Sequence, residues 1–158
     1  MFRWLKRGLA EQLGAAVRSN IDKHGQHVMS VGSGQPRDSD IAYTVGNYEA
    51  GMPELLITGK IANGFSPLLN HLGKLQRDRG FGFRDGEAVS LGGKFPVRLI
   101  DAGEAGRTQC ARFVGSFYGT GDFVLLQVLF PDPDGRMPGD PRCADNFSSQ
   151  RVMKDVSS

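Results

Sequence analysis

The sequence predicts a single compact α+β domain: a mainly antiparallel sheet of about five to six strands with two packed helices and an N-terminal amphipathic helix. Three observations support this fold class. Short apolar segments with strand-like alternation are separated by turns that contain Gly or Pro. Longer segments repeat apolar residues every three or four positions, as helices do. Short links join the early strands, which favours antiparallel pairing over a doubly wound parallel sheet.

Length and composition agree with one globular domain. The 158 residues are 39% hydrophobic and 23% charged, close to ordinary globular values. The formal net charge of +2 lacks the basic excess typical of nucleic-acid binding, so we expect no nucleic-acid partner. The sequence contains no run of about 18 apolar residues, so it predicts no transmembrane helix. No apolar signal-peptide core follows the basic start of the chain, so we expect a cytoplasmic protein.

Residues 1–24 predict an amphipathic helix with more basic than acidic side chains. Such a helix can lie on an anionic membrane surface. It can also pack its apolar stripe on the domain or on a second copy of the chain, as in a homodimer. The residues available for a membrane contact are Phe2, Trp4, Lys6 and Arg7, and the stripe consists of Phe2, Leu5, Leu9, Leu13, Ala16, Val17 and Ile21.

The main domain is predicted at residues 25–140, and it begins with three short strands. Gly25 ends the first helix, because glycine readily adopts the left-handed conformation of a helix C-cap. Gly, Ser and Pro at 32–39 predict a flexible loop between the first two strands. The three strands are predicted at 27–31, 40–46 and 54–58.

Two more helices and three more strands follow. The first helix is predicted to begin near Gly64, with Ser66 as its cap and Pro67 in its first turn, and to end at Gly80. Low apolar content predicts a loosely held tail at 141–158. The other elements are a helix at 107–118 and strands at 88–91, 95–100 and 123–130, the last apolar on both faces and therefore central.

Glu54 is the first candidate for a functional side chain. It follows Pro53 and opens an apolar strand, where a buried carboxylate needs a partner. It could serve as a general base or as a hydrogen-bond acceptor for a ligand. Alternatively, it could accept amides of the neighbouring loop or pair with Arg98. The full set of candidate ligand-binding residues is Tyr43, Thr44, Glu54, Tyr118 and Gln127.

The other candidates also allow two interpretations. Gln127 lies in the central strand, where both ends of its amide need partners, from the backbone or from a ligand. Tyr43 and Tyr118 could each close a pocket with the hydroxyl group or pack at the edge of the core. Tyr43, Thr44 and Glu54 are expected to line a shared surface.

No motif assigns a metal or a cofactor. His24 and His27 are three residues apart, but no Cys or carboxylate completes a ligand set, so we expect no metal. Phosphate-binding loops and nucleophile elbows do not occur, and no motif supports a flavin, so the cofactor stays unknown. Cys110 and Cys143 have no metal or redox spacing and predict free thiols, although a disulfide between them stays open.

Several motifs resemble one family of bacterial proteins. They are His24-Gly25, Ala42-Tyr-Thr-Val-Gly46, Pro53-Glu-Leu55, Phe95-Pro-Val97, Phe117-Tyr-Gly119, Leu126-Gln-Val128, Pro131-Asp132 and Asp134-Gly135. They resemble the domain of unknown function 4262 family, whose name carries no activity. Relatives tend to have a His where this chain has Met52, so a catalytic role of that His would not carry over.

Taken together, the residues favour a small ligand-binding or protein-interaction domain with its polar site on the strands of Tyr43, Glu54 and Gln127. The alternative is an enzyme of unknown reaction that uses the same surface. An enzyme predicts a concave site in which Glu54 or a histidine has a displaced pKa. A binding domain predicts a shallower patch with ordinary titration.

Overall fold

The computed structural model describes residues 2–32 and 39–154, with side chains from residue 8 onward. The side chains named for a membrane contact (Phe2, Trp4, Lys6 and Arg7), most of the expected loop at 32–39 and the end of the expected tail lie outside this part. Among the described residues, no helix is both long and apolar enough to cross a membrane.

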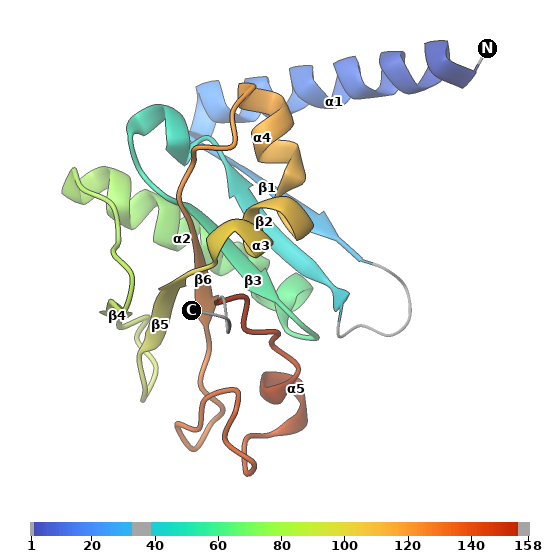
Figure 1. Cartoon of the computed structure of the whole chain (residues 1–158). Coiled ribbons are helices and arrows are strands. Elements are labelled where there is room, and N and C mark those ends of the chain that lie inside the picture. Colours follow the sequence, from blue (N-terminus) through green and yellow to red (C-terminus); the bar gives the residue numbers. More distant parts are fainter. Residues whose placement is uncertain (1, 33–38, 155–158) are drawn as a thin grey trace.

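One six-stranded sheet forms the centre of the molecule (Figure 1). Its strand order is β1-β2-β3-β6-β5-β4, and every neighbouring pair is antiparallel except β3 and β6, which run parallel. The prediction of a mainly antiparallel α+β domain is therefore confirmed. The strands are β1 (His27–Val31), β2 (Ile41–Val45), β3 (Glu54–Thr58), β4 (Ala88–Val89), β5 (Val97–Asp101) and β6 (Leu125–Leu129).

Strand β6 lies in the interior of the sheet, as its apolar sequence predicts. All five of its residues are buried. Side chains alternate across a strand, so Leu126 and Val128 join the core on one face while Leu125 joins the core on the other. A strand covered on both faces needs apolar residues at consecutive positions, which is the pattern that the sequence shows.

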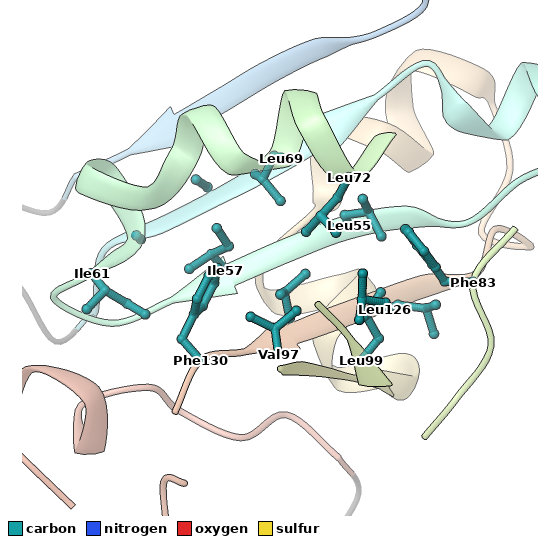
Figure 2. Packing of buried hydrophobic residues seen from close by; sticks show 14 residues of the cluster. Leu55, Ile57, Ile61, Leu69, Leu72, Phe83, Val97, Leu99, Leu126 and Phe130 are labelled. Carbon is teal, nitrogen blue, oxygen red and sulfur yellow. The ribbon is translucent and has the colours of Figure 1, made fainter. Parts of the chain in front are cut away.

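Helix α2 (Ala62–Arg79) covers one face of the sheet. Figure 2 shows Leu69 and Leu72 pointing from this helix toward Leu55 and the neighbouring strands. All three of these leucines are completely buried, and each contributes roughly 1.5–3 kcal/mol relative to an exposed position. This packing places α2 against the β1-β2-β3 half of the sheet.

The predicted start of α2 is wrong. The helix begins at Ala62, two residues before Gly64, and Pro67 lies inside it. Ser66 is no cap, because its hydroxyl group donates to the carbonyl of Asn63 at 3.0 Å. Pro67 has no N–H for that carbonyl, so the Ser66 hydroxyl supplies the missing donor.

Helices α1 (Phe2–His24), α3 (Gly103–Gln109) and α4 (Arg112–Tyr118) are associated with the second core, on the other face. The helix predicted at 107–118 is interrupted, since Cys110 and Ala111 separate α3 from α4. Val17 and Ile21 of α1 are buried, whereas Leu13 and Leu9 are 39% and 65% exposed. The N-terminal part of α1 accordingly extends beyond the body of the domain (Figure 1).

The C-terminal segment differs from the loosely held tail that we expected. It contains α5 (Asp145–Ser148), and Cys143, Gln150 and Met153 are buried. Cys110 and Cys143 are both free thiols, so no disulfide holds this segment.

Candidate functional site

Glu54 closes the turn between β2 and β3. Its side chain is completely buried. The hydroxyl group of Thr44 donates to Oε1 at 2.8 Å, and the backbone amide of Asn47 donates to the same atom at 3.1 Å. The amides of Gly46 and Tyr48 donate to Oε2 at 2.9 and 3.0 Å. The carboxylate thus holds the start of the short 3-10 helix η2 (Asn47–Ala50).

These contacts favour the ionised form of Glu54. Burial raises its pKa, and the four hydrogen bonds oppose that effect. The Thr44 hydroxyl group accepts bonds from the Leu55 amide at 2.9 Å and from Asn47 Nδ2 at 3.2 Å, so its own hydrogen is directed to Glu54. Both carboxylate oxygens only accept. Of the two structural partners expected for Glu54, the structure shows the loop amides. Arg98 does not pair with Glu54 and donates to the carbonyl of Gly86.

The hydrogen bonds continue from Glu54 to the surface. Asn47 Nδ2 donates to Gln26 Oε1 at 2.8 Å, and Arg77 Nη1 donates to both Gln26 Oε1 and Asn47 Oδ1. Gln26 Nε2 in turn donates to the carbonyl of Leu69 at 3.0 Å. We call Gln26, Thr44, Asn47, Glu54 and Arg77 the Glu54–Arg77 network. It joins the α1–β1 turn, the β2–β3 turn and α2.

Two glycines make room for this network. Gly73 lies in the middle of α2, and a Cβ there would collide with Gln26 Oε1. Gly46 has a φ of 127°, and a Cβ there would lie 2.8 Å from the carbonyl oxygen of Gly25. Both positions therefore require glycine if the three segments are to approach this closely.

An open groove of about 640 Å³ lies beside the network, between the end of α1, β1 and α2. Gln26 and Arg77 belong to both the network and the groove. Asn20 Nδ2 lies 2.7 Å from His27 Nδ1 and orients that ring, and burial lowers the pKa of His27. The lining residues are Asn20, His24, Gln26, His27, Val28, Asn70, Lys74 and Arg77, none of which is acidic.

The structure brings together only part of the candidate set. Thr44 and Glu54 are in direct contact. Tyr43 faces the other side of the sheet, in the second core, where burial and the nearby Cys110 raise its pKa to about 12. None of the five candidate residues lines this groove or the pockets beside Phe123, Met137 and Phe147 in the described part of the chain.

Tyr118 lies near the network but outside it. Its hydroxyl group donates to Glu49 Oε2 at 2.7 Å, and its ring centroid lies 4.8 Å from that of Tyr48. Arg18 of α1 pairs with the same Glu49 at 2.8 Å. Burial and the bond to Glu49 raise the pKa of Tyr118. This cluster fastens α1 and α4 to η2.

Gln127 holds the C-terminal segment. Its Nε2 donates to Thr58 Oγ1 at 3.0 Å and to the carbonyl of Arg151 at 2.6 Å, and its Oε1 accepts from the Met153 amide at 2.8 Å. Gln150 makes a similar arrangement with both backbone groups of Phe130. We call the contacts of Gln127 the Gln127 clamp. Both ends of its amide are used within the protein.

The sequence analysis did not identify seven residues of the groove or network as candidates. They are Asn20, Gln26, Val28, Asn47, Asn70, Lys74 and Arg77. A glycine within the apolar helix pattern at residue 73 was an available signal, because it is unfavourable there by about 1 kcal/mol unless another segment approaches closely. His24 and His27 were considered as a pair of metal ligands, not as residues that line a groove. Within the described part of the chain, no three His, Cys, Asp or Glu side chains gather as a metal site would require.

Comparison with known proteins gives one match. Neither a curated protein nor a solved structure matches the chain. A family model matches residues 20–144, which include the whole Glu54–Arg77 network and the groove. The chain therefore belongs to the family described as Domain of unknown function (DUF4262).

Proposed function

We propose that this domain binds a small polar molecule in the groove between α1, β1 and α2. The volume of about 640 Å³ falls within the range of small-molecule sites. The lining offers hydrogen-bond donors from the side chains of Asn20, His27, Asn70 and Lys74. This site differs from the strand surface expected from the sequence. Thr44 and Glu54 do not line the groove, but they hold Asn47, which binds Gln26 and Arg77.

The observation that carries this proposal is the fixed position of Gln26 and Arg77. Both side chains line the groove, and their hydrogen bonds to Asn47 and α2 hold them in position. Binding groups that are already ordered lose less conformational entropy when a ligand arrives. This fixed groove wall therefore favours recognition of a small molecule over the protein-interaction alternative.

Native mass spectrometry of the protein from its own host tests the proposal. We expect a bound small molecule that is released on denaturation. Asn70→Trp places a large ring on the groove wall and should remove that mass. Asn146→Trp is the matched control, since Asn146 is exposed and does not line the groove.

Two results would contradict the proposal. One is a bound molecule that survives Asn70→Trp in a folded protein, because the ligand would then lie elsewhere. The other is a chain that carries only a protein partner, which would favour the protein-interaction alternative.

A second candidate function is an enzyme that uses the same groove. It is favoured by His27, whose ring is oriented by Asn20 and whose pKa is lowered by burial, so that it is neutral near pH 7. Chemical conversion of the bound molecule by the wild type, lost in His27→Gln while binding persists, would support it. Binding without conversion would leave the binding domain as the function.

We also propose that the protein is cytoplasmic. The support is that Cys110 and Cys143 are both free in a chain of ordinary globular composition. Compartment-specific thiol labelling in the host tests this location, and a periplasmic or extracellular signal would contradict it.

A further inference from the structure

Arg77 carries a charge without a direct acidic partner in the described part of the chain. Its guanidinium is partly buried, and its hydrogen bonds go to neutral oxygens only. Two are the side-chain oxygens of Gln26 and Asn47, and the third is the carbonyl of His24 at 3.4 Å. The bond to His24 is long and comes from Nη2 alone. This nitrogen therefore has hydrogen-bonding capacity to spare.

Burial lowers the pKa of Arg77, while the more distant charges of Glu54 and Asp78 oppose that effect. A desolvated cation is unfavourable unless an opposite charge comes close. Neither of these acids lies within salt-bridge distance of the guanidinium, among the ion pairs of the described residues. An oxyanion in the groove would supply the missing partner, and Arg is well shaped for carboxylate and phosphate groups.

Lys74 provides a second cation on the same wall. Its Nζ lies 2.6 Å from Asp78 Oδ2, and the two side chains are 70% and 63% exposed. Exposed pairs of this kind contribute little to stability, so the ammonium group exchanges partners readily. Because no lining residue of the groove is acidic, an incoming anion meets no like charge on its walls.

We propose that the ligand of the groove carries an oxyanion, a carboxylate or a phosphate, that pairs with Arg77 and Lys74. This inference rests on the proposed function and narrows it to anionic molecules. The Glu54–Arg77 network sets the position of the guanidinium, and Lys74 adds an adjustable charge at the rim. Asp78 competes with the ligand for Lys74.

Titrations followed by the backbone amide signals of the full chain test the charge requirement. The probes are inorganic phosphate, acetate and acetamide at constant ionic strength, acetamide being the neutral counterpart of acetate. We expect phosphate or acetate to shift the signals of Val28, Asn70 and Arg77, and acetamide to leave them unchanged. Comparison of phosphate with acetate distinguishes the two kinds of oxyanion.

Two exposed variants test the assignment without disturbing the network. Lys74→Gln should weaken binding of the effective anion by on the order of 3-fold, and Asp78→Asn should strengthen it by a similar factor. Lys94→Gln is the control, because Lys94 is an exposed lysine that lies outside this groove. Equal effects of Lys74→Gln and Lys94→Gln would indicate nonspecific charge and overturn the assignment.

Other outcomes separate this inference from the proposed function. If acetamide shifts the groove signals as much as acetate does, or if no anion shifts them, the requirement for an oxyanion is wrong. A neutral molecule that co-purifies with the wild type and is lost in Asn70→Trp would then still support the proposed function. If Asn70→Trp still binds both the anionic probes and the co-purified molecule, this inference and the proposed function are both wrong.

Discussion

Two buried polar sites on the same sheet differ in how much hydrogen-bonding capacity they leave without a partner in the described part of the chain. The Glu54–Arg77 network and the Gln127 clamp are both built around completely buried side chains. In the clamp, both ends of the Gln127 amide bind the C-terminal segment or its neighbour Thr58. In the network, the chain of bonds ends at Arg77, which borders a groove and has no acidic partner in direct contact among the described residues.

The comparison shows that burial alone does not identify a binding residue. Glu54 and Gln127 were both candidates in the sequence, yet each is satisfied by the protein's own groups. Spare hydrogen-bonding capacity beside a groove is more informative, and it belongs to Arg77. The predictions below test this difference, beginning with the largest expected effect.

Glu54→Gln should destabilise the domain by about 3 kcal/mol, because an amide nitrogen would face backbone N–H donors in a buried site. Urea unfolding monitored by circular dichroism measures the change. Glu49→Gln serves for comparison and should cost less, since Glu49 lies in the same 3-10 helix but is exposed and binds side chains only on the surface. A variant as stable as the wild type would show that Glu54 is not a structural carboxylate, and would reopen its role as a ligand acceptor.

Gly73→Ala should cost about 2 kcal/mol, because the added methyl group displaces Gln26 and disturbs the network. Gly64→Ala is a matched change in the same helix with nothing within 4 Å of the new Cβ. It should be neutral or stabilising by up to about 1 kcal/mol. Similar unfolding free energies for the two variants would contradict the close approach of Gln26 to α2.

Gln127→Leu should cost about 1.5 kcal/mol, since the Met153 amide and the Arg151 carbonyl lose a buried partner. Limited proteolysis should cut the C-terminal segment faster than in the wild type. Ligand binding in the groove should not change, because Gln127 does not line it. A loss of binding in a folded variant would show that the Gln127 clamp and the Glu54–Arg77 network are coupled, and would contradict their description as separate sites.

The smallest effect concerns Glu49, the exposed acid of the same turn. The hydrogen bond from Arg18 lowers its pKa, with further help from Tyr118. Its stabilisation is therefore present above the pKa of the unfolded chain and is lost as pH falls through the folded pKa. The difference in melting temperature between wild type and Glu49→Gln should shrink from pH 7 to about pH 3. A difference that does not depend on pH would contradict the ion pair.

Local patterns predicted most of the fold. Strand β3 was predicted with its observed bounds, because Pro53 precedes it and five residues of strand-like composition follow. The order of the elements and the interior position of β6 were also predicted. The break at Cys110 and Ala111 was missed, since the apolar spacing of a helix continues through it. The start of α2 was missed because Ser66 followed by Pro67 is a pattern typical of a helix N-terminus, whereas both residues lie inside the helix.

The candidate site was less predictable because its contacts are distant in sequence. Gln26, Asn47 and Arg77 belong to three different elements, and no local spacing connects them. The C-terminal segment was misjudged for a related reason. Few apolar residues in the segment predict little burial, but the side-chain amides of Gln127 and Gln150 also hold it.

The parallel pairing of β3 with β6 has a consequence for synthesis of the chain on the ribosome. Strands β1, β2 and β3 are complete early, but the partner that covers the free edge of β3 emerges only after α2, β4, β5, α3 and α4. At roughly 5–20 residues per second, that edge stays open for several seconds. The Leu55–Ile57 segment is then exposed to pairing with another nascent chain. Aggregation during expression should therefore depend more on translation speed after residue 58 than on the stability of the finished domain.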